Sequence, residues 1–189
     1  TLKKRTLKKV YCLGDSHITV FDSINKSFTS LAYFFDLTII EGATVSGLKN
    51  PNSKTGTINL INNKLTELDG ENVIICFGEV DCGFVIWWRA QNKDESLEYM
   101  LKKAVDNYIE LIERIRSKAE QLVVISAPLP TIMDNAILGE VANLRSSISA
   151  NYSQRMNLTL RFNQLVKEYC ASINFSDLIY MDLDNLSID

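Results

Sequence analysis

A short run near the N-terminus, Gly14-Asp15-Ser16-His17, combines groups that serine chemistry requires. It follows an apolar stretch, residues 10–13, whose β-branched and aromatic residues predict a buried strand. Apolar residues at helical spacing follow the run, so Ser16 is expected at a strand-to-helix turn. The free N–H groups at the start of the helix can hold an oxyanion there. A glycine here lets a substrate approach the backbone. Capping of the helix by Asp15 or Ser16 is the structural alternative, because both residue types are favoured N-caps.

A second polar group, Gly78-Glu79-Val80-Asp81, follows the most apolar stretch of the chain. That stretch, residues 72–77, predicts a strand in the centre of a parallel sheet. Between the two groups, residues 41–53 are mostly small and turn-forming and include Gly42 and Gly47. They predict a long loop, of the kind that can carry function at the end of a strand.

Strand-like and helix-like stretches alternate along the chain, which predicts one α/β domain with an open, parallel, doubly wound sheet. In such a sheet the ligand site lies beyond the carboxyl ends of the strands. This rule places Ser16, the 42–47 loop, residues 79–81, the 128–131 loop and Asp182 on one rim. The expected strands are 10–13, 37–40, 72–77, 121–126 and 178–181, and the expected helices are 18–26, 57–68, 94–118, 137–143 and 153–172.

Composition excludes several classes of partner. The net charge of −3 argues against nucleic acid, and no apolar run is long enough for a membrane span. The four cysteines form no CxxC pair and there is one histidine, so no zinc site and no cofactor are expected. Cys12 and Cys76 lie in apolar stretches and are expected as buried free thiols, which favours a reducing, cytoplasmic location.

The two polar groups, in this order and at strand ends, resemble blocks of the SGNH (GDSL) hydrolase superfamily of serine esterases and acyl hydrolases. The resemblance implies a flavodoxin-like three-layer α/β/α sandwich with a five-stranded parallel sheet. It implies that Ser16 is the nucleophile and that its own N–H is one oxyanion donor. Gly47 looks like the glycine that supplies another, Gly42 being the less favoured candidate. Three acidic residues are expected at the oxyanion and substrate side of the site: Asp15, Glu79 and Asp81.

Two residues depart from the family pattern. Val80 stands where the family has an asparagine that donates to the oxyanion, and loss of one such donor costs about 10²–10³ in rate. The family's base is a histidine three residues after an aspartate, beyond the last strand, whereas this chain has only His17, poorly placed for Ser16. We expect the chain to be cut off before this block, and to be nearly inactive as it stands, because a serine without a base is weakly nucleophilic. The missing initiator Met also favours a fragment.

The leading functional hypothesis is a serine esterase acting on a small-molecule or glycan ester, with Trp87-Trp88-Arg89 available to stack on a sugar. A sugar O-acyltransferase would use the same nucleophile and donors. A non-catalytic glycan-binding or scaffold domain is the alternative from another class, favoured by Val80 and by the missing base. A Mg²⁺-dependent phosphotransfer site would use the hard oxygen ligands of Asp15, Glu79 and Asp81, without the phosphate-binding glycine loop it would need.

Overall fold

Five parallel strands form the centre of the computed structural model, which describes residues 7–27, 32–50, 55–134, 147–173 and 175–186. The strand order is β2-β1-β3-β4-β5, and every neighbouring pair is parallel. The order reverses at β1, so the carboxyl ends of β1 and β3 form a topological switch point. The bounds are β1 Lys8–Gly14, β2 Tyr33–Ile39, β3 Asn72–Cys76, β4 Gln121–Ile125 and β5 Leu178–Met181.

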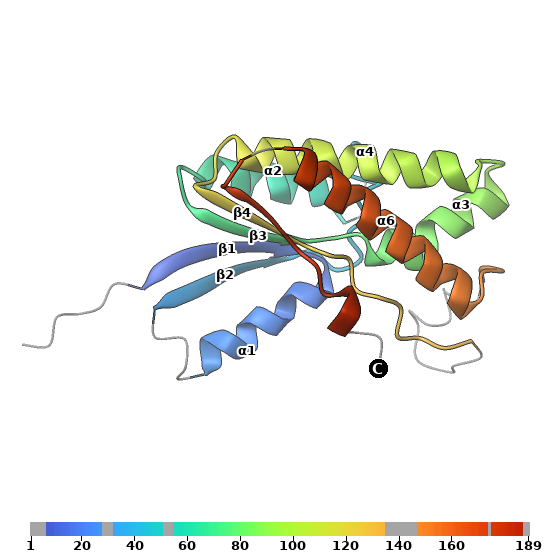
Figure 1. Ribbon diagram of the computed structural model, residues 1–189, viewed down its shortest axis with the longest axis horizontal. Helices are drawn as coiled ribbons and strands as arrows, with labels where there is room; N and C mark the ends of the chain where they lie inside the picture. The colour runs from blue at the N-terminus through green and yellow to red at the C-terminus, as the bar shows by residue number, and fades with distance from the viewer. Residues whose placement is uncertain (1–6, 28–31, 51–54, 135–146, 174, 187–189) are drawn as a thin grey trace, which may run out of the picture.

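Helices cover both faces of the sheet and make the predicted three-layer sandwich (Figure 1). One face carries α2 (Thr57–Glu67), α4 (Leu97–Arg116) and α6 (Tyr152–Ser172), with α3 (Ile86–Asn92) packed beside α4. The other face carries α1 (Val20–Lys26). The helix predicted at 137–143 lies outside the described residues. No helix in the described part of the chain has both the length and the apolarity of a membrane span.

The alternation of side chains along each strand divides the core into two clusters. Val73 and Ile75 of β3 join the larger cluster beneath α2, α4 and α6. Ile74, between them, points to the α1 face, where one apolar residue from every strand lies in register. This row consists of Leu37, Cys12, Ile74, Val123 and Ile179.

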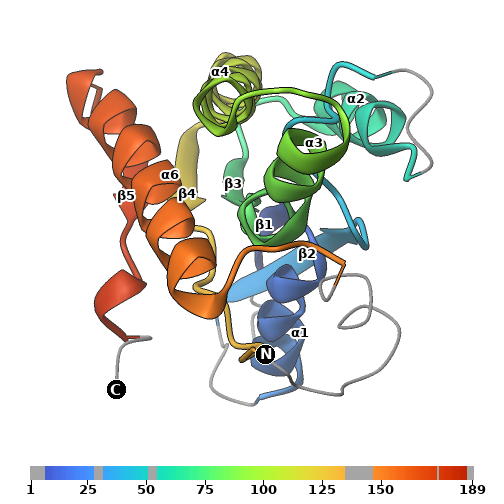
Figure 2. The same cartoon turned by 90° about the vertical axis from the view of Figure 1, so that its right-hand side faces the viewer.

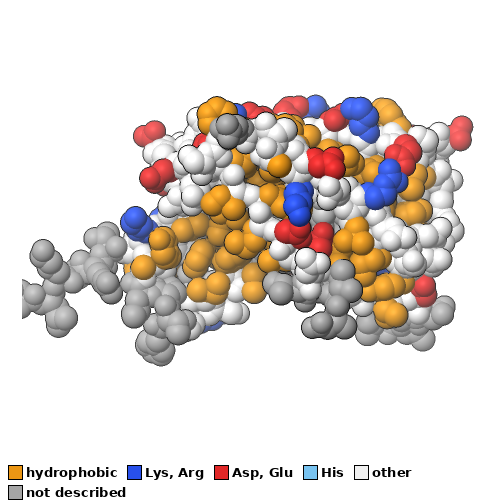
Figure 3. Space-filling model, in the orientation of Figure 1, with side chains coloured by type: hydrophobic (Ala, Val, Ile, Leu, Met, Phe, Trp, Pro, Cys, Tyr) orange, Lys and Arg blue, Asp and Glu red, His pale blue; other side chains and the backbone are white. Residues whose placement is uncertain are grey.

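The row on the α1 face is covered unevenly. At the β2 end Phe21 of α1 packs on Phe35, with ring centroids 5.1 Å apart. At the β5 end Ile179 and Met181 are 40% and 43% exposed. Figure 3 shows hydrophobic side chains gathered over the strands on this side of the molecule. α1 is too short to cover the whole width of the sheet.

The second strand begins earlier than the sequence indicates, at Tyr33 rather than at residue 37. Asp36 interrupts the apolar pattern, which is why the prediction started after it. In the structure the Asp36 carboxylate is paired with Lys9 at 2.7 Å and Lys64 at 3.3 Å. These ion pairs with the neighbouring strand and with α2 allow an acidic residue inside the edge strand.

Candidate active site

Ser16 lies immediately beyond β1, as the first residue of a short 3-10 turn, Ser16–Thr19. The side chain is exposed. The carboxyl ends of the strands face the viewer in Figure 2. Gly14 closes the strand, and a Cβ there would lie 2.5 Å from the Cys76 carbonyl oxygen. Close packing against β3 is therefore sufficient to explain why this position is a glycine, whether or not a substrate approaches it.

Asp15, and not Ser16, is the N-cap of the turn. Its Oδ1 accepts the His17 backbone N–H at 3.0 Å and lies 2.8 Å from His17 Nδ1. Asp15 is completely buried, whereas Ser16 and His17 are exposed. Its second oxygen, Oδ2, is buried and has no hydrogen-bond partner among the described residues. The capping role therefore falls on Asp15 and leaves the serine at the surface.

Asp81 joins the second polar group to the loop that follows β2. It begins a π-helical turn, Asp81–Val85, that leads from β3 into α3. Its Oδ2 accepts the Val45 N–H at 2.7 Å, and its Oδ1 accepts the Ser46 N–H at 3.0 Å. Complete burial raises the pKa of Asp81 to about 6; the bonds from Ser46 and Val45 oppose this rise, and the nearby charge of Asp15 adds to it. The loop is thus fixed to the rim by a buried carboxyl group.

The two glycines proposed from the sequence have different settings in this loop. Gly47 directly follows the two residues held by Asp81, and its N–H donates to Thr44 Oγ1 at 3.1 Å and to Thr44 O at 3.2 Å. An oxyanion would receive this N–H only after it had left Thr44. Gly42 is exposed and occupies a turn with φ of +66°.

The remaining residues of the second polar group have separate surroundings. Glu79 is buried and Val80 is half-buried. Both oxygens of Asp81 accept backbone N–H groups. Among the described residues, no three or more His, Cys, Asp or Glu side chains are grouped so that they could hold a metal ion. The magnesium hypothesis therefore finds no ligand set in this part of the chain.

A cavity of about 200 Å³ opens beside His17, between the start of α1 and the ends of β3, β4 and β5. Its walls are mostly apolar and include Phe21, Ile125, Leu129, Met181 and Leu183. Cys76 also lines it, but burial and the nearby Asp15 raise the pKa of the thiol to about 12. The thiol is therefore protonated at neutral pH and is not a nucleophile. As predicted, Cys12 and Cys76 are buried and free.

Two buried asparagines support the rim and were not anticipated from the sequence. Asn163 of α6 accepts the Ala127 N–H at 2.8 Å and donates to Ala127 O at 2.9 Å and to Asp184 Oδ1 at 2.8 Å. It thereby fixes the segments that follow β4 and β5. Asn107 of α4 contacts the loop that Asp81 holds. The signal was available, because Asn107 lies three residues after Ala104 and four before Leu111, on the inner face of the helix.

The other rim residues divide between packing and exposure. Trp87 donates its Nε1–H to Cys82 O at 2.9 Å and packs on the main core. Trp88, its neighbour on α3, is 37% exposed. Asp182 pairs with Lys167 of α6 at 2.7 Å, which lowers the pKa of the carboxyl group. Pro128 and Leu129 of the 128–131 loop line the cavity.

Solved structures with a similar fold include two esterases or lipases and a drug-metabolizing enzyme. Axe2, an acetylxylan esterase from Geobacillus stearothermophilus, is 14% identical, with a TM-score of 0.51 over 90% of this chain and 75% of that chain. Phospholipase A1 from Streptomyces albidoflavus NA297 is 14% identical, with a TM-score of 0.53 over 95% and 81%. BT4096, a gut microbial diltiazem-metabolizing enzyme, is 11% identical, with a TM-score of 0.56 over 97% and 38%.

These similarities concern the fold. No protein-family model and no curated protein matches the chain. The chain has a three-layer α/β/α fold with a five-stranded parallel sheet, as the sequence predicts, and it shares this fold with the solved structures above.

Proposed function

We propose that this protein is a serine ester hydrolase with Ser16 as its nucleophile. The observation that carries the proposal is the place of Ser16, which is exposed at the carboxyl end of β1, on the rim where Asp81 anchors the Gly47 loop. The switch point of an α/β sheet is where such folds bind ligands. The names of two structural neighbours, an acetylxylan esterase and a phospholipase A1, support ester hydrolysis by analogy of fold.

In the proposed reaction, Ser16 Oγ attacks the carbonyl carbon of the ester. The N–H groups of Ser16 and Gly47 stabilise the tetrahedral oxyanion, the alcohol leaves, and water hydrolyses the acyl-enzyme to the free acid. A base must take the serine proton. His17 is held by Asp15 at 2.8 Å. The resemblance to the SGNH hydrolases implies that the base is the histidine of an Asp-x-x-His block, a motif that residues 1–189 do not contain.

The surroundings of Ser16 favour a small acyl group. The cavity beside His17 holds about 200 Å³, which at ~30 Å³ per water-sized group corresponds to about seven such groups. Exposed Trp88 offers an aromatic face for a sugar as the alcohol part of the ester. A sugar O-acyltransferase would share every one of these groups and differ only in the acceptor of the acyl group.

A fluorophosphonate probe tests the nucleophile directly. We expect the probe to label Ser16 in a chain extended past Asp189, and the label to disappear in Ser16→Ala. Rates on p-nitrophenyl esters from acetyl to octanoyl should fall once the acyl chain outgrows the cavity. Absence of label in both the extended and the 189-residue protein would overturn the proposal.

A non-catalytic glycan-binding domain is the second candidate. Two observations favour it: the Gly47 N–H is already bonded to Thr44, and Val80 brings no donor. Under this alternative, calorimetry would show xylo-oligosaccharide binding by the 189-residue protein, and Ser16→Ala would bind equally well. Ester turnover that depends on Ser16 would dispose of it.

A further inference from the structure

We propose that Asn107 of α4 is a positioning residue that orients the Gly47 N–H. It rests on the proposed function in one respect: the Gly47 N–H is taken to be a donor to the oxyanion. The observation behind it is that two buried side chains from different elements, Asp81 and Asn107, bind the same two loop residues.

The two side chains divide the polar groups of the loop between them. Asp81 accepts the N–H groups of Val45 and Ser46. Asn107 donates through Nδ2 to the carbonyl oxygens of the same residues, at 3.1 Å to Val45 O and at 3.4 Å to Ser46 O. Both sides of the backbone at 45–46 are thus held from within the protein.

The contact with Ser46 O reaches Gly47 through the peptide group. The Ser46 carbonyl and the Gly47 N–H belong to one planar unit and point in opposite directions. A side chain that holds the carbonyl therefore fixes the direction of the N–H, which points to Thr44 in this structure. Asp81 does not hold this peptide group, because it binds the N–H groups of Val45 and Ser46, which precede the Ser46–Gly47 peptide.

Burial explains why this position carries an asparagine. Asn107 is 4% exposed and lies on the inner face of α4 among apolar residues such as Ala104 and Leu111. A buried amide is unfavourable unless it is hydrogen-bonded. The two loop carbonyls supply that bonding, so the side chain and the loop need each other.

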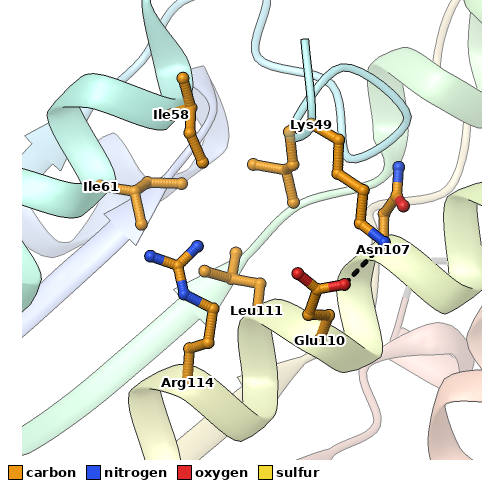
Figure 4. Close-up of a pocket in the computed structure, with 8 residues that line it drawn as sticks. Lys49, Ile58, Ile61, Asn107, Glu110, Leu111 and Arg114 are labelled. Carbon is orange, nitrogen blue, oxygen red and sulfur yellow. Dashed lines mark ion pairs between the residues drawn. The ribbon is translucent and has the colours of Figure 1, made fainter. Parts of the chain in front are cut away.

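The loop has a second attachment to α4, which is weaker. Lys49 pairs with Glu110 at 2.6 Å across a groove of about 360 Å³ between α2 and α4, which Asn107 borders (Figure 4). The side chains of this pair are 58% and 53% exposed. Exposed ion pairs contribute little, so the buried Asn107 dominates the attachment.

Asn107→Leu tests the proposal, because leucine fills the space and removes the donor. We expect amide exchange at residues 45–48 to rise about 10-fold, the loss expected for about one hydrogen bond. Labelling of Ser16 by fluorophosphonate should slow by about 10- to 100-fold, as small misplacements of catalytic groups do. Thr159→Val is the control, since Thr159 is also buried but its hydroxyl bonds to Arg155 O and to the Cys82 side chain, and not to the 41–50 loop.

Unchanged exchange at 45–48 in a folded Asn107→Leu protein would overturn the proposal. If that variant fails to fold, the wild-type protein decides: the Asn107 side-chain amide should exchange slowly, and fast exchange would contradict its buried bonds. Failure of the proposed function gives a different result, namely no labelling of wild-type Ser16. The exchange measurement remains decisive in that case.

Discussion

The ring of Phe162 in α6 lies directly against the backbone of Gly78, where β3 ends. Gly78 has φ of +117°, and a Cβ there would lie 2.5 Å from Phe162 Cε1 and 3.1 Å from the Ala127 Cβ. Phe162 is buried and stacks on Tyr108 with ring centroids 5.9 Å apart, so it has no room to move aside. Backbone conformation and packing both require glycine at the start of the second polar block.

Gly78→Ala should lower the free energy of unfolding by about 2–5 kcal/mol, because it adds strain at a positive φ to overpacking of the core. Chemical denaturation measures this. Gly70→Ala is the matched control: φ there is +85°, but no heavy atom lies within 4 Å of the added Cβ. Gly70→Ala should lower the free energy of unfolding only by the cost of the strained backbone conformation, about 1–3 kcal/mol. Equal losses in the two variants would show that Phe162 yields.

Most of the fold was predictable from local patterns in the sequence. Apolar runs such as residues 72–77 mark strands that are buried on both faces, and the structure places β3 in the centre of the sheet. The start of β2 was wrong because Asp36 breaks its pattern, and only tertiary ion pairs with Lys9 and Lys64 restore it. The sequence analysis predicted neither the π-helical turn nor α3. The bulky apolar residues of this segment could equally belong to the core, to the wall of a pocket or to a helix.

The rim of the site was predictable, but its internal bonds were not. Topology alone brings Asp81 and the 41–53 loop to the same side of the sheet. The backbone angles of the loop decide which loop residues Asp81 binds. No pattern in the sequence predicts these angles. The bond of the Gly47 N–H to Thr44 is of the same kind.

Asp81 makes stability depend on pH in a defined direction. Its folded pKa of about 6 lies above the ordinary value of 3.8, so the folded protein binds the proton more tightly. The stability from this group is present below pH 3.8 and is lost as pH rises through 6. Between pH 4 and 7 the free energy of unfolding of the wild-type protein should fall by about 2–3 kcal/mol relative to that of Asp81→Asn, at about 1.4 kcal/mol per pKa unit.

Urea denaturation of both proteins at several pH values measures this difference. All other titrating groups are common to the two proteins, so their contributions cancel in the comparison. Parallel curves of unfolding free energy against pH would mean that Asp81 titrates near its ordinary pKa.

Val80→Asn should restore the side-chain donor that the family resemblance assigns to this position. Val80 is half-buried directly before Asp81, so an amide fits between core and solvent there. Addition of one oxyanion donor should raise the rate of ester hydrolysis by the Ser16-dependent route by about 10²-fold or more. Leu60→Asn, on the exposed surface of α2 and outside the cavity beside His17, serves as the control. A rate that does not change would place residue 80 outside reach of the oxyanion.

The two neighbouring tryptophans should separate binding from stability. Trp88 is 37% exposed on α3, so Trp88→Ala should weaken xylo-oligosaccharide binding about fivefold, for a stacking contribution of about 1 kcal/mol. Trp87 is bonded to Cys82 O and packed on the core, so Trp87→Ala should lower the melting temperature instead. Calorimetric titration and thermal melting of both variants make the comparison. Unaltered sugar binding by Trp88→Ala would remove α3 from the proposed sugar site.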